Sequence, residues 1–224
     1  MREQLTHAIE DYLKAIYKLS NSGGRVTTTE IANQLNVTPA SVTGMVQRLA
    51  SNDPSWVNYQ KHRGVSLTPK GEHVALEIIR HHRLIEMFLH EILGYPWEEV
   101  HDEAERLEHV ISEKFEERIA EVLGNPTHDP HGDPIPTRDL KILPACDTRL
   151  SDLRPDQHAV VMRVHDSDPD LLRHLAGLGL KPETKVSILE YSPFDENLMI
   201  HVQGQPAPVI LGRKITQQVF VDIL

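Results

Sequence analysis

At 224 residues, with 39% hydrophobic and 25% charged side chains, the chain is large enough for two or three folded domains and is neither disordered nor collagen-like. It has no apolar run that could span a bilayer, no signal peptide and only one cysteine, so we expect a cytoplasmic protein without disulfides and without a membrane partner. The net charge of −10 is uneven: residues 1–71 hold eight Lys or Arg and five acids, whereas the remainder holds most carboxylates and twelve of the fourteen histidines. The N-terminal part can therefore approach a polyanion, and the rest is suited to cations.

Residues 1–71 predict a winged helix-turn-helix domain. Apolar residues recur with a helical period over residues 5–19. A second helix is expected behind an N-cap at Thr28, and a third behind an N-cap at Thr38. Two short strands around the basic turn at residues 61–64 follow, and this hairpin would form the wing.

The third helix and the basic turn indicate DNA binding, because a helix opened by small polar residues suits the major groove and a basic wing suits phosphates. Glutamine can pair with adenine, and Pro or Ala can contact a thymine methyl group. The candidate DNA contacts are Thr38, Pro39, Ala40, Ser41, Thr43, Gln47, Lys61 and Arg63. Two alternatives remain: the three helices form only a core, or the winged helix binds another protein.

A helical domain is predicted over residues 72–140, with one helix over residues 72–93 and another that runs unbroken over residues 97–124. A linker is expected at residues 141–157, in a region rich in proline. Residues 158–224 contain short runs that alternate apolar and polar side chains, a pattern typical of a small all-β domain such as a barrel.

The stretch HDEAERLEH places acidic and imidazole side chains on one helical face. His101 and His109 lie roughly 12 Å apart along a helix axis, too far for one ion to bind both. Glu105, Glu108 and His109 form a tight group, and His101 lies about one turn earlier.

The preceding helix repeats the same spacing with His82 and Glu86, and an antiparallel pair of helices would bring both next to His101. A solvated surface is the alternative, but apolar neighbours such as Leu107 and Ile111 place the charged face at the edge of the core. Unpaired carboxylates would be unfavourable there, so two neighbouring cation sites are the favoured interpretation.

No catalytic residues are predicted, and we expect the chain not to be an enzyme. The zinc-protease spacing HExxH, the nucleophile motif GxSxG, a CxxC pair and a glycine-rich phosphate loop are all absent from the sequence. A di-iron carboxylate bundle needs two Glu-x-x-His pairs, and only Glu98 with His101 fits.

Three segments, AIEDYLKAIYKL, RHHRLIEMFL and VHDEAERLEHVISEKFEERI, resemble the diphtheria-toxin-repressor family of metal-dependent transcription regulators, and the resemblance extends over nearly the full length. It implies a mainly α protein with a β-rich C-terminal domain: a winged helix-turn-helix, a helical dimerisation domain that binds metal, and an SH3-like (FeoA-like) domain. HGDPIP resembles the linker of that family.

The resemblance implies two ions per chain. One site would use Asp11 with Glu105, Glu108 and His109, and the other would use His82, Glu86 and His101. Iron-responsive members have Met and Cys at the positions of Asp11 and Glu105, so the chain resembles the manganese-responsive branch. Oxygen-rich sites also suit hard Mn²⁺, although Fe²⁺, Co²⁺, Cd²⁺ or Zn²⁺ can bind in vitro. Further ligands from the third domain would fall near His165, Asp166 and Asp168, where the local match is poor.

The resulting hypothesis is a manganese-dependent repressor of metal-uptake genes that binds a palindromic operator in double-stranded DNA as a metal-loaded homodimer, without an organic substrate. Without metal, Asp11, Glu86, Glu105 and Glu108 would repel one another, and two ions would cancel their charge. The alternatives are an iron-dependent regulator of the same family, a metal-independent winged-helix repressor that senses an organic ligand, and a metalloenzyme or metal-storage protein.

Overall fold

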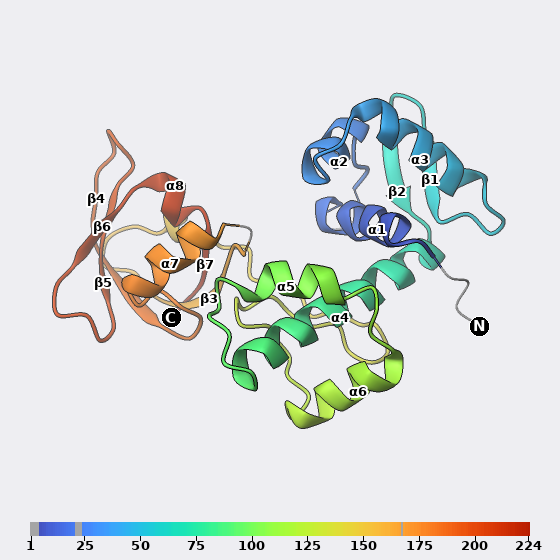
Figure 1. Cartoon of the computed structure of the whole chain (residues 1–224). Coiled ribbons are helices and arrows are strands. Elements are labelled where there is room, and N and C mark those ends of the chain that lie inside the picture. The colour runs from blue at the N-terminus through green and yellow to red at the C-terminus, as the bar shows by residue number, and fades with distance from the viewer. Residues whose placement is uncertain (1–4, 21–23, 167) are drawn as a thin grey trace. The chain divides into compact units, whose positions relative to one another are not determined.

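The structure is a computed structural model that describes residues 5–20, 24–166 and 168–224 (Figure 1). The chain forms two compact units, and each combines segments that are distant in sequence. The first unit comprises Met1–His81, Glu108–Val110 and Pro136–Lys141, and the second comprises His82–Leu107, Ile111–Ile135 and Ile142–Leu224.

The first unit contains the predicted winged helix-turn-helix. Its elements are α1 (His7–Leu19), α2 (Thr28–Gln34), α3 (Pro39–Ser51), β1 (Val57–Gln60), β2 (Gly64–Leu67) and the first part of α4 (Pro69–Glu91). Thr38 caps α3 as expected, whereas the cap of α2 is Thr27, so the prediction of Thr28 is wrong by one residue. Thr27 is favoured because Glu30 lies three residues later and completes a capping box with it.

One apolar core connects the elements of the first unit. Leu13 and Ile16 of α1 share it with Val42 and Leu49 of α3, and all four side chains are fully buried. The antiparallel hairpin β1–β2 adds Val65 to the same core. A constraint on α1 is therefore felt by α3 through direct packing.

The part of the second unit before residue 142 contains the later part of α4, α5 (Val100–Leu107) and α6 (Glu113–Val122). The expectation of one unbroken helix over residues 97–124 is therefore wrong. Ser112 caps α6 by accepting a hydrogen bond from the backbone N–H of Phe115, and the β-branched pair Val110 and Ile111 precedes it. Those residue types favour a restart over a continuous helix.

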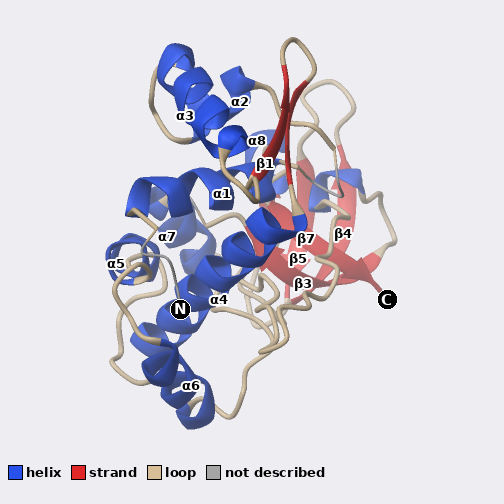
Figure 2. Ribbon diagram, turned by 90° about the vertical axis from the view of Figure 1, so that its right-hand side faces the viewer, coloured by secondary structure: helices blue, strands red, loops and turns tan. Residues whose placement is uncertain are grey.

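The β-rich part of the second unit is an antiparallel five-stranded sheet in the order β6-β5-β4-β3-β7. Its strands are red in Figure 2. Its strands are β3 (His158–Val164), β4 (Lys185–Tyr191), β5 (Leu198–Val202), β6 (Val209–Leu211) and β7 (Val219–Ile223). Three helical segments that the sequence pattern did not predict, η1 (Leu150–Asp152), α7 (Pro169–Gly177) and α8 (Arg213–Thr216), lie between strands or before them. The fold class, with a winged helix-turn-helix, a helical part and a β-rich end, is confirmed.

The loop that contains HGDPIP packs directly against β3. The backbone N–H of Val164 donates to the carbonyl of His131 at 2.9 Å. Gly132 has a φ of +93°, and a Cβ atom there would lie only 2.0 Å from the carbonyl oxygen of Met162. Only glycine allows this approach. Among the described helices, none has the length and apolarity needed to cross a membrane.

Replacement of Gly132 by alanine is expected to lower the free energy of unfolding by about 2 kcal/mol or more, because strained backbone and a backbone clash add together. Urea unfolding of the variant measures this loss. Gly124→Ala is the matched control, since Gly124 has a φ of +73° but its added Cβ meets no described atom within 4 Å. Equal losses in the two variants would contradict the packing argument.

Candidate metal centres and DNA interface

The first candidate centre, the Asp11 cluster, consists of Asp11, Glu108 and His109. One ligand atom of each lies within 4.8 Å of the others. His109 Nε2 donates to Asp11 Oδ1 at 2.8 Å, and His109 Nδ1 donates to Glu10 Oε2 at 2.7 Å. Burial lowers the pKa of His109, but the hydrogen bonds to Asp11 and Glu10 and the charge of Glu108 raise it to about 9. The imidazole is therefore protonated at neutral pH.

Lys14 contacts the same cluster, and sequence reasoning missed it. Its Nζ donates to both carboxylate oxygens of Glu108, at 2.8 and 2.7 Å, and both side chains are buried. Glu108 is thus compensated by an ammonium group, which differs from the expectation that it only repels other carboxylates. The one available signal was that Lys14 follows Asp11 by three residues and so shares its helix face.

The second candidate centre, the Glu86 cluster, consists of His82, Glu86, His101 and Asp166. His82 Nε2 lies 2.9 Å from Glu86 Oε1 and 3.1 Å from His101 Nδ1. His101 Nδ1 lies 3.1 Å from the same carboxylate oxygen and 3.4 Å from Asp166 Oδ2. Two nitrogen and two oxygen atoms from α4, α5 and the segment after β3 thus converge on one point.

This cluster fits a divalent ion. Ligand atoms about 3 Å apart match the span of bonds near 2.0–2.3 Å to a shared ion. Burial raises the pKa of Glu86, but the charge of His82 and the hydrogen bond from His101 hold it well below its ordinary value, so the group is a carboxylate. Its Oε2 is buried and has no hydrogen-bond partner among the described residues. This second carboxylate oxygen is therefore also available as a metal ligand.

A second buried layer lies next to Glu86. Asp129 and His131 each bring a ligand atom within 4.8 Å of Glu86. His131 Nε2 donates to the carbonyl of Trp97 at 2.7 Å, which fixes its tautomer. Burial and the charges of Glu86 and Asp133 raise the pKa of Asp129 well above its ordinary value. Asp129 and His131 thus lie beside Glu86, whose Oε2 accepts no hydrogen bond among the described residues.

The structure places Glu105, Asp166 and Asp168 in three different surroundings. Glu105 belongs to the second unit, and its Oε1 lies 3.9 Å from His82 Nδ1 and 3.8 Å from His101 Nε2. It therefore faces the ring nitrogens that point away from Glu86, whereas the resemblance grouped it with Asp11. Asp166, where the local match to the family is poor, joins the Glu86 cluster, and Asp168 instead caps α7.

The candidate DNA contacts lie on α3 and on the β1–β2 turn of the first unit. Six candidates at the start and along the exposed side of α3 are Thr38, Pro39, Ala40, Ser41, Thr43 and Gln47, and only Thr43 is half-buried. Lys61 and Arg63 are exposed in the turn between the two strands. Arg48, also exposed on α3, is a cation that the candidate set omitted.

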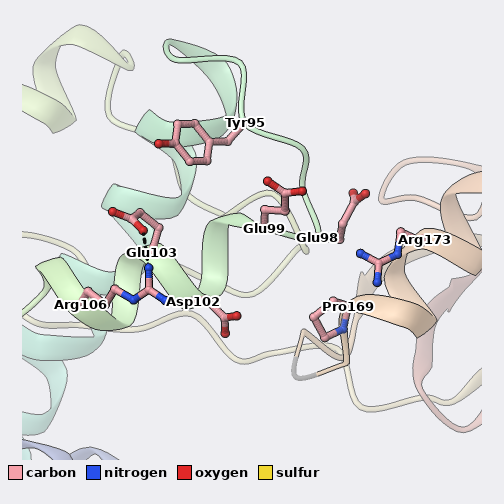
Figure 3. A pocket seen from close by; sticks show the side chains of 8 residues that line it. All are labelled: Tyr95, Glu98, Glu99, Asp102, Glu103, Arg106, Pro169 and Arg173. Carbon is pink, nitrogen blue, oxygen red and sulfur yellow. Dashed lines mark hydrogen bonds and ion pairs between the residues drawn. The ribbon is translucent and has the colours of Figure 1, made fainter.

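One open pocket of about 390 Å³ in the second unit is distinct from both clusters (Figure 3). Its lining residues are Tyr95, Glu98, Glu99, Asp102, Glu103, Arg106, Pro169 and Arg173, none of which is a candidate ligand. Arg106 pairs with Glu103 at 3.0 Å, so part of its charge is compensated internally.

Three family descriptions match consecutive parts of the chain. Residues 4–65 match "Iron dependent repressor, N-terminal DNA binding domain", residues 68–137 match "Iron dependent repressor, metal binding and dimerisation domain", and residues 148–223 match "FeoA domain". The chain is 37% identical over 213 residues to the iron-dependent repressor IdeR of Mycobacterium leprae, which covers 89% of this chain and 90% of that protein.

Solved structures give the same fold. A manganese-dependent transcriptional repressor in complex with manganese has a TM-score of 0.88 and 35% identity, covering 96% of this chain and 100% of that one. ScaR with bound Zn²⁺ has a TM-score of 0.79 and 35% identity, covering 96% and 98%. Relatives named for iron and for manganese thus both resemble this chain.

If the Asp11 cluster holds a divalent ion, its affinity for Mn²⁺ is expected to rise roughly tenfold per pH unit between about pH 6.5 and 8.5, because His109, with its pKa raised to about 9, would have to lose a proton. The raised pKa also stabilises the chelator-treated protein below the ordinary His pKa of about 6.5, and this contribution is lost as pH rises through about 9. Anaerobic chelator competition measures the affinity, and His109→Gln, which lacks the titrating group, should give a smaller slope. A slope in the native chain no steeper than in His109→Gln would show that His109 does not bind the ion.

Proposed function

Because this chain belongs to the iron-dependent repressor family, whose members are metal-dependent transcriptional repressors that bind DNA, we propose that it is the manganese-responsive kind. In this proposal a metal-loaded homodimer binds a palindromic operator and represses genes for metal uptake. The family itself carries no catalytic activity, in agreement with the absence of catalytic motifs.

The observation that carries the choice of manganese is the chemistry of the Asp11 cluster. Asp11 and Glu108 offer carboxylate oxygens, His109 offers one imidazole, and no sulfur atom belongs to the group. Hard oxygen ligands suit Mn²⁺, whereas thiolate and thioether ligands suit softer ions. Relatives named for manganese support this choice, and the identity to an iron-dependent repressor keeps iron as the second candidate.

Two ions per chain are proposed. Asp11, Glu108 and His109 would hold one, with Glu105 as the further ligand that the resemblance implies. His82, Glu86, His101 and Asp166 would hold the other. When bound, each ion supplies positive charge that draws carboxylates from separate segments of the chain together.

Restraint of Asp11 is the proposed route from metal to DNA. Asp11 lies on α1, whose Leu13 and Ile16 pack in the same core as α3. An ion that ties Asp11 to His109 would therefore limit the positions available to the recognition helix. A coupling of about 1–3 kcal/mol corresponds to roughly 5–150-fold in DNA affinity, enough for a switch.

A homodimer would present two recognition helices at a fixed spacing, as a palindromic operator requires. Exposed apolar side chains on the second unit support such an interface. They are Ile92 and Leu93 after α4, together with Phe115 and Val122 of α6, each at least 49% exposed in the single chain.

DNA binding is expected to require a divalent metal. Mn²⁺ should be effective at a lower concentration than Mg²⁺ or Ca²⁺, the other ions that prefer oxygen ligands. Fluorescence anisotropy with a duplex selected by the protein from a random library measures this, with a chelator as the baseline. Asp11→Ala should raise the Mn²⁺ midpoint about tenfold or more, whereas Asp102→Ala, an exposed position on α5, should leave it unchanged. Equal DNA binding in chelator would instead support the metal-independent repressor.

The double substitution Asp11→Met with Glu105→Cys is expected to move the response from Mn²⁺ toward Fe²⁺ or Co²⁺, because softer sulfur ligands replace two carboxylates. The ratio of midpoints for Mn²⁺ and Co²⁺ under anaerobic conditions is the measurement. The same ratio in the double variant and the native chain would refute the argument from ligand softness.

A further inference from the structure

The Asp11 cluster contains its own cations. Asp11, Glu10 and Glu108 bring three carboxylates together, and His109 and Lys14 bring two positive charges. His109 is a member of the proposed ligand set and would release a proton to solvent when it binds an ion. Lys14 has no such role in the proposed function, yet it contacts one of the ligands directly.

The contact between Lys14 and Glu108 occupies both oxygens of the carboxylate. Nζ lies 2.8 Å from Oε1 and 2.7 Å from Oε2, and the side chains are 6% and 0% exposed. Oε1 is also the atom of Glu108 that lies 3.4 Å from His109 Nε2, on the side of the proposed ion. The Lys14 ammonium and the proposed ion would therefore compete for the same carboxylate oxygens of Glu108.

A buried ammonium this close to a divalent site acts against the ion in two ways. It repels the positive charge of the ion, and this repulsion is much stronger at short range in a protein interior than in water. It also holds lone pairs that the ion needs. Without the ammonium, however, Glu108 would be a buried carboxylate with reduced compensation, which is strongly unfavourable.

We infer that Lys14 is an internal counter-ion of Glu108 that competes with the divalent ion and so sets the concentration at which the Asp11 cluster fills. This inference rests on the proposed metal binding by that cluster. The side chain stabilises the protein before an ion arrives and releases Glu108 when the ion binds. The Asp11 cluster then stays without an ion at low ion concentration and binds one only at high concentration.

Three substitutions on α1 test the competition in the full-length chain. Lys14→Gln keeps an N–H donor for Glu108 and removes the charge, whereas Lys14→Arg keeps the charge. Lys18→Gln removes a lysine from the same helix outside the cluster and is the matched control. Mn²⁺ binding is followed anaerobically by chelator competition, and thermal unfolding is followed in chelator and in excess Mn²⁺.

Lys14→Gln is expected to bind Mn²⁺ at about tenfold lower concentration than the native chain, and Lys14→Arg at an equal or higher concentration. In chelator, Lys14→Gln should unfold at a lower temperature than Lys18→Gln, and added Mn²⁺ should raise its unfolding temperature by more than it does for the native chain. An unchanged or higher Mn²⁺ requirement in Lys14→Gln, or a lower one in Lys14→Arg, would overturn the inference. If Lys14→Gln does not fold in chelator, the Lys14→Arg measurement still decides.

Asp11→Ala separates this inference from the site proposal. If Asp11→Ala binds Mn²⁺ as the native chain does, the proposed site is wrong and the competition fails with it. If Asp11→Ala loses binding while Lys14→Gln binds as the native chain does, the site stands and only the role of Lys14 is wrong.

Discussion

A carboxylate without contact to water needs a positive partner, and this requirement shapes both candidate centres. Glu108 and Glu86 are completely buried. Glu108 is paired with the ammonium of Lys14, and Glu86 Oε1 lies 2.9 Å from His82 Nε2 and 3.1 Å from His101 Nδ1. The desolvation of each carboxylate would otherwise oppose folding by several kcal/mol. In the proposed function, a divalent ion would supply positive charge to each of these buried carboxylates.

The effect of such an ion would differ between the centres because the partners differ. Imidazoles can lose a proton and remain in place as neutral ligands, so the Glu86 cluster keeps the same side chains before and after an ion binds. An ammonium offers no lone pair in its charged form, so Lys14 has to leave the ion's side of Glu108. The Asp11 cluster thus has more to rearrange, and it is also the centre that shares a helix with the DNA-binding core. The proposed movement of Lys14 and the DNA-binding helix α3 are thus located in the same unit.

Local sequence patterns predicted the parts of the molecule that local forces determine. The i, i+4 pair of His82 and Glu86, the cap at Thr38 and the winged helix all follow from spacing that a single element enforces. The break before Ser112 was missed because a periodic apolar pattern continues across it while the chain itself leaves the helix. Lys14 was missed because one lysine on a helix is most often exposed, and its burial depends on a residue 94 positions away. Placement of Asp166 required the fold of the third domain, which no spacing within the first 140 residues contains.

The first unit is discontinuous, and this has a consequence for how such a protein can be divided. A fragment that stops at His81 would carry Asp11 and Lys14 together with the reading helix, but neither Glu108 nor His109. No single cleavage of the polypeptide yields a DNA-binding piece with a complete Asp11 cluster and leaves the second unit whole. The residues of the proposed ion site and the recognition helix are interleaved along the gene, so recombination at one crossover point could not transfer the proposed ion response to an unrelated DNA-binding module.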